Sequence, residues 1–128
     1  MKIATNIARI VLGLLFTVFG LNGFLHFIKM APPTGQLAGQ YMGALFLSHY
    51  LVVVFLLQLI GGVLLLVNRY VPLALVLLGP VVVNIVLFHS TMAPEGLPMA
   101  LLATLLWVVV FAGVHKAFAP IFQAKVAA

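Results

Sequence analysis

The stretch that decides the fold is residues 45–67, which read LFLSHYLVVVFLLQLIGGVLLLV and contain no charged side chain. The hydrocarbon core of a bilayer is about 30 Å thick, and about 20 helical residues are needed to cross it. Backbone N–H and C=O groups in lipid must hydrogen-bond within their own segment, which an α-helix achieves. The β-branched residues within 51–55 would favour a strand in water, but lipid overrides this propensity. We therefore expect a membrane-spanning helix over 45–67.

Apolar runs of similar length lie on both sides of this stretch, and polar or charged residues close each of them. Asn68, Arg69 and Tyr70 form a short polar link to the next run, so these two helices should form an antiparallel hairpin. The sequence therefore predicts a single transmembrane domain. Its fold is an all-α, integral membrane four-helix bundle with helices over 7–28, 45–67, 71–89 and 97–114.

The segments outside the four helices are expected to contact the membrane surface. The tail over 115–128 mixes Phe118, Ile121 and Phe122 with two lysines, a pattern typical of a segment that lies in the interface. Between the first and second helices, we expect Thr34 to cap a short interfacial helix that precedes the second span.

The composition excludes whole classes of protein. Hydrophobic residues make up 66% of the chain and charged residues 5%, with a mean hydropathy of +1.35. Soluble domains carry about 25% charged residues, and disordered chains are polar and charged, so neither class fits. The basic residues stand at the edges of the apolar runs rather than in a cluster, so their expected partner is lipid and not nucleic acid. The absence of cysteine excludes thiolate nucleophiles and iron–sulfur clusters.

The basic residues also predict how the chain crosses the membrane. With four spans, one side carries five cations and the other carries only Lys29. Cytoplasmic loops are enriched in Lys and Arg, so both termini should face the cytoplasm. We expect a multi-pass protein of the bacterial inner (plasma) membrane. The five cations on the cytoplasmic side are Lys2, Arg9, Arg69, Lys116 and Lys125.

Polar side chains at membrane depth form the candidate site, because lipid penalises polar groups and this topology brings most of them to the outer half. We expect them to line a small pocket in the periplasmic half of the bundle, facing one another, with His89 at its rim. The alternative is that they only join helices, at about 0.6 kcal/mol each. His49, near the same interface, is expected to reach headgroups or water instead. The candidates are Asn22, His26, Gln58, Asn84 and His89.

The residue types limit the chemistry of such a pocket. The chain has no aspartate, and its one glutamate, Glu95, lies in a loop, which argues against a Ser–His–Asp triad and a carboxylate proton relay. Histidines without acidic partners make a poor zinc site, and no motif supports a haem between His26 and His89. A quinone headgroup needs one or two hydrogen-bonding side chains against apolar walls, which these residues would supply. We therefore expect no catalytic residue, no metal site, and a quinone rather than a haem as cofactor.

Three short motifs in the chain resemble those of DoxX-like membrane proteins. They are Arg9 followed by FGLNGFLHF over 19–27, LLQLIGG over 56–62, and LGPVVVN over 78–84. The resemblance covers essentially the whole chain and implies a compact four-helix bundle in the bacterial inner membrane. The family is linked to quinol or thiosulfate oxidation and to oxidative-stress complexes, usually through accessory subunits. Related sequences often carry a glutamate where this chain has Gln58, which can hydrogen-bond but cannot carry a proton.

Three functions fit these observations, and an accessory or binding subunit of a quinone-linked membrane redox system ranks first. A stand-alone quinone-linked oxidoreductase would need a second electron carrier, and the sequence offers no redox residue for one. A small-solute or ion transporter would need buried charge. We therefore do not expect an enzyme acting on its own. The expected partners are the lipid bilayer and either another membrane protein or further copies of the chain in a homo-oligomer.

Overall fold

The structure is a computed structural model that describes residues 2–127, and every regular element within them is a helix. The prediction of an all-α protein is therefore confirmed. The elements in chain order are α1 (Lys2–Leu25), α2 (Gln36–Leu47), α3 (Tyr50–Leu66), α4 (Val71–Thr91), the 3-10 helix η1 (Pro94–Gly96), α5 (Leu97–Val114) and the 3-10 helix η2 (His115–Phe122).

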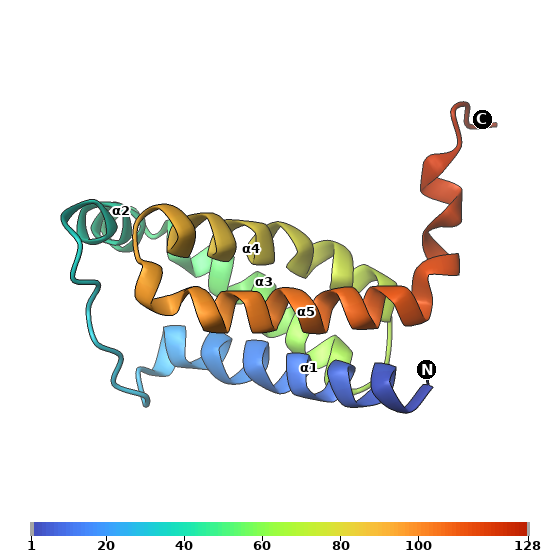
Figure 1. The fold of residues 1–128 in the computed structure, drawn as a ribbon, viewed down its shortest axis with the longest axis horizontal. Helices are drawn as coiled ribbons and strands as arrows, with labels where there is room; N and C mark the ends of the chain where they lie inside the picture. The colour runs from blue at the N-terminus through green and yellow to red at the C-terminus, as the bar shows by residue number, and fades with distance from the viewer. Residues whose placement is uncertain (1, 128) are drawn as a thin grey trace.

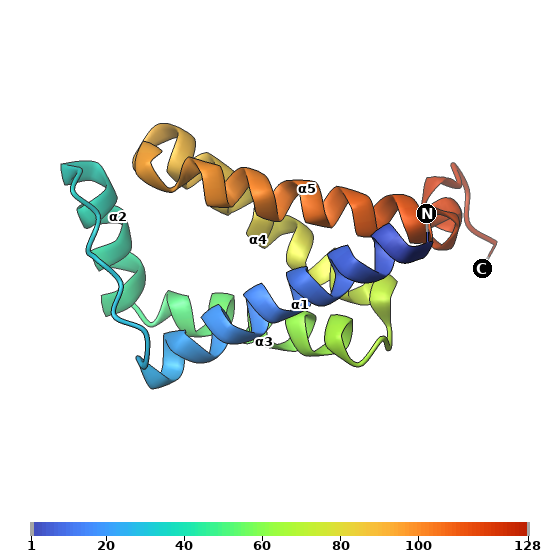
Figure 2. The ribbon, with the colours of Figure 1, turned by 60° about the horizontal axis from the view of Figure 1, so that its bottom comes forward.

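The long helices α1, α3, α4 and α5 lie roughly side by side. α2 crosses the end of the bundle that is opposite the chain termini (Figure 1). α1 packs on α3 and α4 packs on α5, and further contacts join α1 to α5 and α3 to α4. Figure 2 shows that the two pairs approach each other at the end that holds the N-terminus and diverge toward α2.

Small residues set the close contact between α1 and α3. Gly20 lies against the backbone of Leu59, and a Cβ placed on Gly62 would come within 2.6 Å of the Thr17 backbone nitrogen. Without side chains at these positions the two helices can approach closely, as small residues permit in membrane bundles. The fully buried large side chains of the core are Leu12, Leu65, Leu75, Leu78 and Val110.

Three helical segments are long and apolar enough to cross a membrane, namely Lys2–Leu25, Val71–Thr91 and Pro94–Phe122. α2 and α3 pass the same test only when taken together, and they are bent by 86° at the break between them. Large apolar side chains are exposed along the outside of the bundle, where a soluble protein would carry charge. These are the features of a multi-pass membrane protein.

The predicted helix over 45–67 is wrong at its start. Residues up to Leu47 belong to α2, and α3 begins only at Tyr50. His49 between them has a φ of 62°, in the left-handed region, which a right-handed helix cannot include. The chain therefore turns at His49, and only α3 packs within the bundle.

The other helices keep their predicted places, with ends that shift by a few residues. α1 starts earlier than predicted and ends at Leu25 rather than at 28, while α4 continues to Thr91 rather than stopping at 89. α5 begins and ends at the predicted residues, 97 and 114. The short helix expected before the second span is α2, but its N-cap is Gly35 rather than Thr34, and no side chain caps it.

The two chain termini lie at the same end of the bundle (Figure 1). The predicted interfacial tail forms η2 and then a segment without regular structure, and η2 turns away from the axis of α5 (Figure 1). Its last residue, Ala128, lies outside the described residues. The opposite end of the bundle carries α2 and η1.

Candidate functional site

Gln58 lies in the middle of α3 with only 8% of its surface exposed. On one side of it, Gly20 of α1 touches the backbone of Leu59. On the other side, Gly61 lies against Leu78 of α4. This register places the Gln58 side chain between α1 and α4, near the middle of the bundle.

None of the side-chain hydrogen bonds within residues 2–127 involves the amide of Gln58. The polar atoms that are fully enclosed without a partner in that range are Thr5 Oγ1, Arg9 Nε and Thr17 Oγ1. Gln58 is not among them, so its amide keeps a small accessible surface. Gln58 is thus a largely buried amide whose donors and acceptor have no partner within the described residues.

Asn22 is also buried, with 7% of its surface exposed, but both of its polar atoms are occupied. Its Nδ2 donates to the carbonyl oxygen of Ile28 at 3.2 Å, and its Oδ1 accepts from the backbone N–H of Ile28 at 2.7 Å. The side chain therefore holds the chain where it leaves α1. Because both bonds go to the Ile28 backbone, they favour a structural role for Asn22 over a role in a pocket.

His26 follows the end of α1 and is exposed. Its φ is 52°, and its backbone N–H donates to the carbonyl oxygen of Asn22 at 2.9 Å. This is the left-handed conformation that commonly ends a helix, more often with glycine. The side chain is thus carried away from the buried core.

Asn84 and His89 both bond to the backbone of their own helix. Asn84 is exposed on α4, and its Nδ2 donates to the carbonyl oxygen of Pro80 at 2.9 Å. The Nδ1 of His89 lies 2.9 Å from the carbonyl oxygen of Ile85. The half-buried ring of His89 also rests on Gly96, where an added Cβ would lie 2.2 Å from Nε2.

The expectation that the polar side chains face one another inside the bundle is therefore wrong for three of them. His26 and Asn84 are exposed, and Asn22 is buried but turned to its own loop. The physical reason is that a short amide reaches nearby backbone more easily than a partner on another helix: Asn84 bonds to Pro80 one turn earlier, and Asn22 bonds to Ile28 in the loop after α1. Gln58 keeps the position that the prediction gave it.

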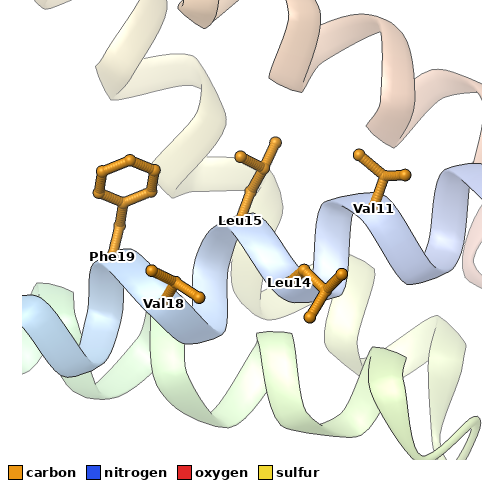
Figure 3. Close-up of a pocket in the computed structure, with 5 residues that line it drawn as sticks. All are labelled: Val11, Leu14, Leu15, Val18 and Phe19. Atoms are coloured by element: carbon orange, nitrogen blue, oxygen red, sulfur yellow. The ribbon is translucent and has the colours of Figure 1, made fainter.

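Two hollows lie elsewhere on the bundle, and none of the predicted site residues lines either. A groove of about 320 Å³ runs along α1 and is wholly apolar. Figure 3 shows Val11, Leu15 and Phe19 rising from the same side of α1, with Leu14 and Val18 beside them. The second hollow, of about 120 Å³, lies at the bend between α2 and α3 and is lined by Gly23, Phe24, Phe46, His49, Leu51, Val52 and Phe55.

Arg9 has a structural role that the sequence reasoning missed. Its Nη1 donates to the carbonyl oxygen of Leu65 and lies 3.5 Å from that of Leu66. These carbonyls end α3, where a cation also interacts favourably with the helix dipole. The available signal was that Arg9, although it stands at the edge of the apolar run, lies inside the predicted helix over 7–28.

No protein-family model, curated protein or solved structure matches this chain. The resemblance to DoxX-like proteins therefore stays a prediction. Among residues 2–127, no three His, Asp or Glu side chains gather closely enough to hold a metal ion. The fold by itself defines an α-helical protein of the multi-pass membrane type.

Proposed function

We propose that this chain is a four-span, DoxX-like subunit of the bacterial inner membrane that binds a quinone headgroup at Gln58 in support of a membrane redox system. The observation that supports the proposal is the position of Gln58, a largely buried polar side chain in the middle of α3 that bonds to no group in residues 2–127. An amide left without a hydrogen bond in an apolar medium costs roughly 1–3 kcal/mol by protein mutational data. A ligand with a carbonyl or hydroxyl group would remove that penalty.

The chemistry of the amide favours binding over catalysis. A glutamine offers one carbonyl acceptor and two N–H donors, which suits both the carbonyl groups of a quinone and the hydroxyl groups of a quinol. It cannot take up or release a proton, so proton-coupled turnover would need another group. The protein would hold the headgroup, and a partner would supply the electrons.

The apolar groove along α1 offers a place for the hydrophobic tail of such a ligand. Phe19, which lines the groove, directly precedes Gly20, and Gly20 touches the backbone next to Gln58. The groove and the amide therefore lie at the same height of the bundle. An isoprenoid chain needs only apolar contact, which every side chain of this groove supplies.

The four-span topology with both termini in the cytoplasm is part of this proposal. α3 alone has 17 residues, a length of about 26 Å at 1.5 Å per residue. This length approaches the bilayer core, so α3 would cross while α2 lies in the interface. Five of the six cations belong to segments at the end that holds the termini, which supports a cytoplasmic assignment of that end.

The test is a titration of the purified full-length protein with a short-tailed quinone, decylubiquinone, followed by thermal unfolding. We expect the unfolding midpoint of the wild type to rise with ligand. Gln58→Leu should be at least as stable without ligand, because it removes an unmatched buried amide, and should bind at least about tenfold more weakly.

Asn84→Leu is the matched control, since it removes an exposed amide that already has a partner. It should leave quinone binding unchanged. Equal binding by wild type and Gln58→Leu, or no binding by the wild type, would refute the proposed function.

A further inference from the structure

Within residues 2–127, the end of the bundle that holds both termini carries exposed cations and no acidic side chain. Lys2 starts α1, Arg69 lies in the turn after α3, and Lys116 and Lys125 belong to the tail; all four side chains are exposed. The one acidic residue of the chain, Glu95, lies in η1 at the opposite end. We call these four cations the basic end.

Specific contacts bring the segments of the basic end together. The side chain of Thr5 in α1 lies against Gly113 near the end of α5, where an added Cβ would come within 2.4 Å. Arg9 reaches across to the carbonyl oxygen of Leu65 near the end of α3. The first turns of α1 and the last turns of α3 and α5 are therefore neighbours, and the four cations lie in these turns or in the segments that follow them, at one end of the bundle (Figure 2).

The tail adds exposed apolar side chains to this surface. Phe118 is buried and packs on Phe111, with 5.0 Å between the ring centroids. Ile121 and Phe122, a few residues later, are 70% and 79% exposed. The Phe118 ring thus packs the tail against α5, while the side chains of Ile121 and Phe122 are exposed.

We propose that the basic end binds the phosphate headgroups of anionic phospholipids, with Ile121 and Phe122 inserted among the headgroups. A cationic surface alone would attract any polyanion. The combination of lysines with projecting apolar side chains, on the end face of an apolar bundle, matches a charged lipid surface instead. The fit rests on charge complementarity and is independent of the quinone site at Gln58.

The chain contains its own reporter for this contact. Trp107, its only tryptophan, stacks on Phe111 with 5.4 Å between the ring centroids and 7° between the planes. Phe111 in turn packs on Phe118 of the tail. A change in how the tail sits on the surface should therefore alter the fluorescence of Trp107.

The test is a titration of the full-length protein, in a neutral detergent, with phosphatidylglycerol or phosphatidylcholine, followed by Trp107 fluorescence and native mass spectrometry of bound lipid. We expect saturable binding of phosphatidylglycerol only. Lys116→Gln combined with Lys125→Gln should weaken it about 25-fold, since each cation near an anionic surface contributes about fivefold.

Lys29→Gln is the matched control, because it removes the one cation that lies outside the basic end and Arg9. It should bind phosphatidylglycerol as the wild type does, and millimolar inorganic phosphate should not compete. The proposal fails if the double variant binds like the wild type, if both lipids bind equally, or if free phosphate displaces the lipid.

Discussion

Polar side chains in this bundle satisfy their hydrogen bonds mainly on the backbone of their own segment. Asn22 bonds to the backbone of Ile28, and Asn84 bonds to that of Pro80. Such partners are always near and need no exact alignment of two helices. Gln58 differs because it is buried without any such bond, which is why we assign the ligand to it.

Alanine substitutions at the two asparagines compare a buried with an exposed amide in their effect on the free energy of unfolding. Asn22→Ala removes two hydrogen bonds at a buried position, so the free energy of unfolding should fall by about 1–3 kcal/mol. Asn84→Ala removes an exposed bond to its own helix, and the free energy should change by less than about 0.5 kcal/mol. Thermal unfolding in detergent measures both. Equal losses in the two variants would contradict the assigned roles.

The sequence could show which polar residues lie at membrane depth but not which way they turn. The position of Asn22 depends on the left-handed turn at His26, where a histidine stands in a conformation that favours glycine. Nothing in the pattern around His26 signals that turn. The burial of Gln58, in contrast, could be predicted because it lies mid-helix among apolar residues on every side.

At the scale of the elements, the contact between α1 and α3 depends on glycines, and the bend between α2 and α3 depends on His49. The bounds of α5 could be predicted because proline and glycine precede the helix and polar residues follow it. The break at His49 could not, because the segment lies within a long apolar run and neither proline nor glycine marks it. The Oγ of its neighbour Ser48 accepts a hydrogen bond from the Tyr50 N–H and so supports the bend, but a serine alone does not predict one.

Alanine substitutions at two glycines distinguish the effect of helix packing on stability from that of helix propensity. Gly62→Ala should lower the free energy of unfolding by about 1–3 kcal/mol, because the new methyl group meets the Thr17 backbone on α1. Gly39→Ala in α2 has open space around it and should raise the free energy by up to about 1 kcal/mol. Chemical or thermal unfolding of both variants measures the difference. A neutral Gly62→Ala would show that α1 and α3 are not in close contact.

At the scale of the whole molecule, the cations are distributed unequally between the two ends of the bundle. Both termini and the turn after α3 form the end that carries five of the six cations, and Lys29 belongs to the loop near α2. The sequence predicted this grouping because it follows from counting spans and charges. The divergence of the two helix pairs could not be predicted, because it depends on side-chain packing between helices far apart in the chain.

Reporter fusions test the orientation that we propose. A reporter fused after Ala128 should be active only if it is a cytoplasmic type, and a periplasmic reporter inserted in the loop after Lys29 should be active as well. Activity of a periplasmic reporter at the C-terminus would reverse the orientation. Matched fusions to a chain with Arg69 and Lys116 replaced by glutamine should show a mixed topology.

The claim that Gln58 holds a quinone is tested most directly by the lipids that accompany the protein out of its membrane. The measurement is the amount of quinone extracted per molecule of purified wild type, Gln58→Leu and Asn84→Leu, quantified by mass spectrometry. The account predicts close to one quinone per molecule in the wild type and in Asn84→Leu, and at least about tenfold less in Gln58→Leu. Equal amounts in all three, or none in the wild type, would contradict it.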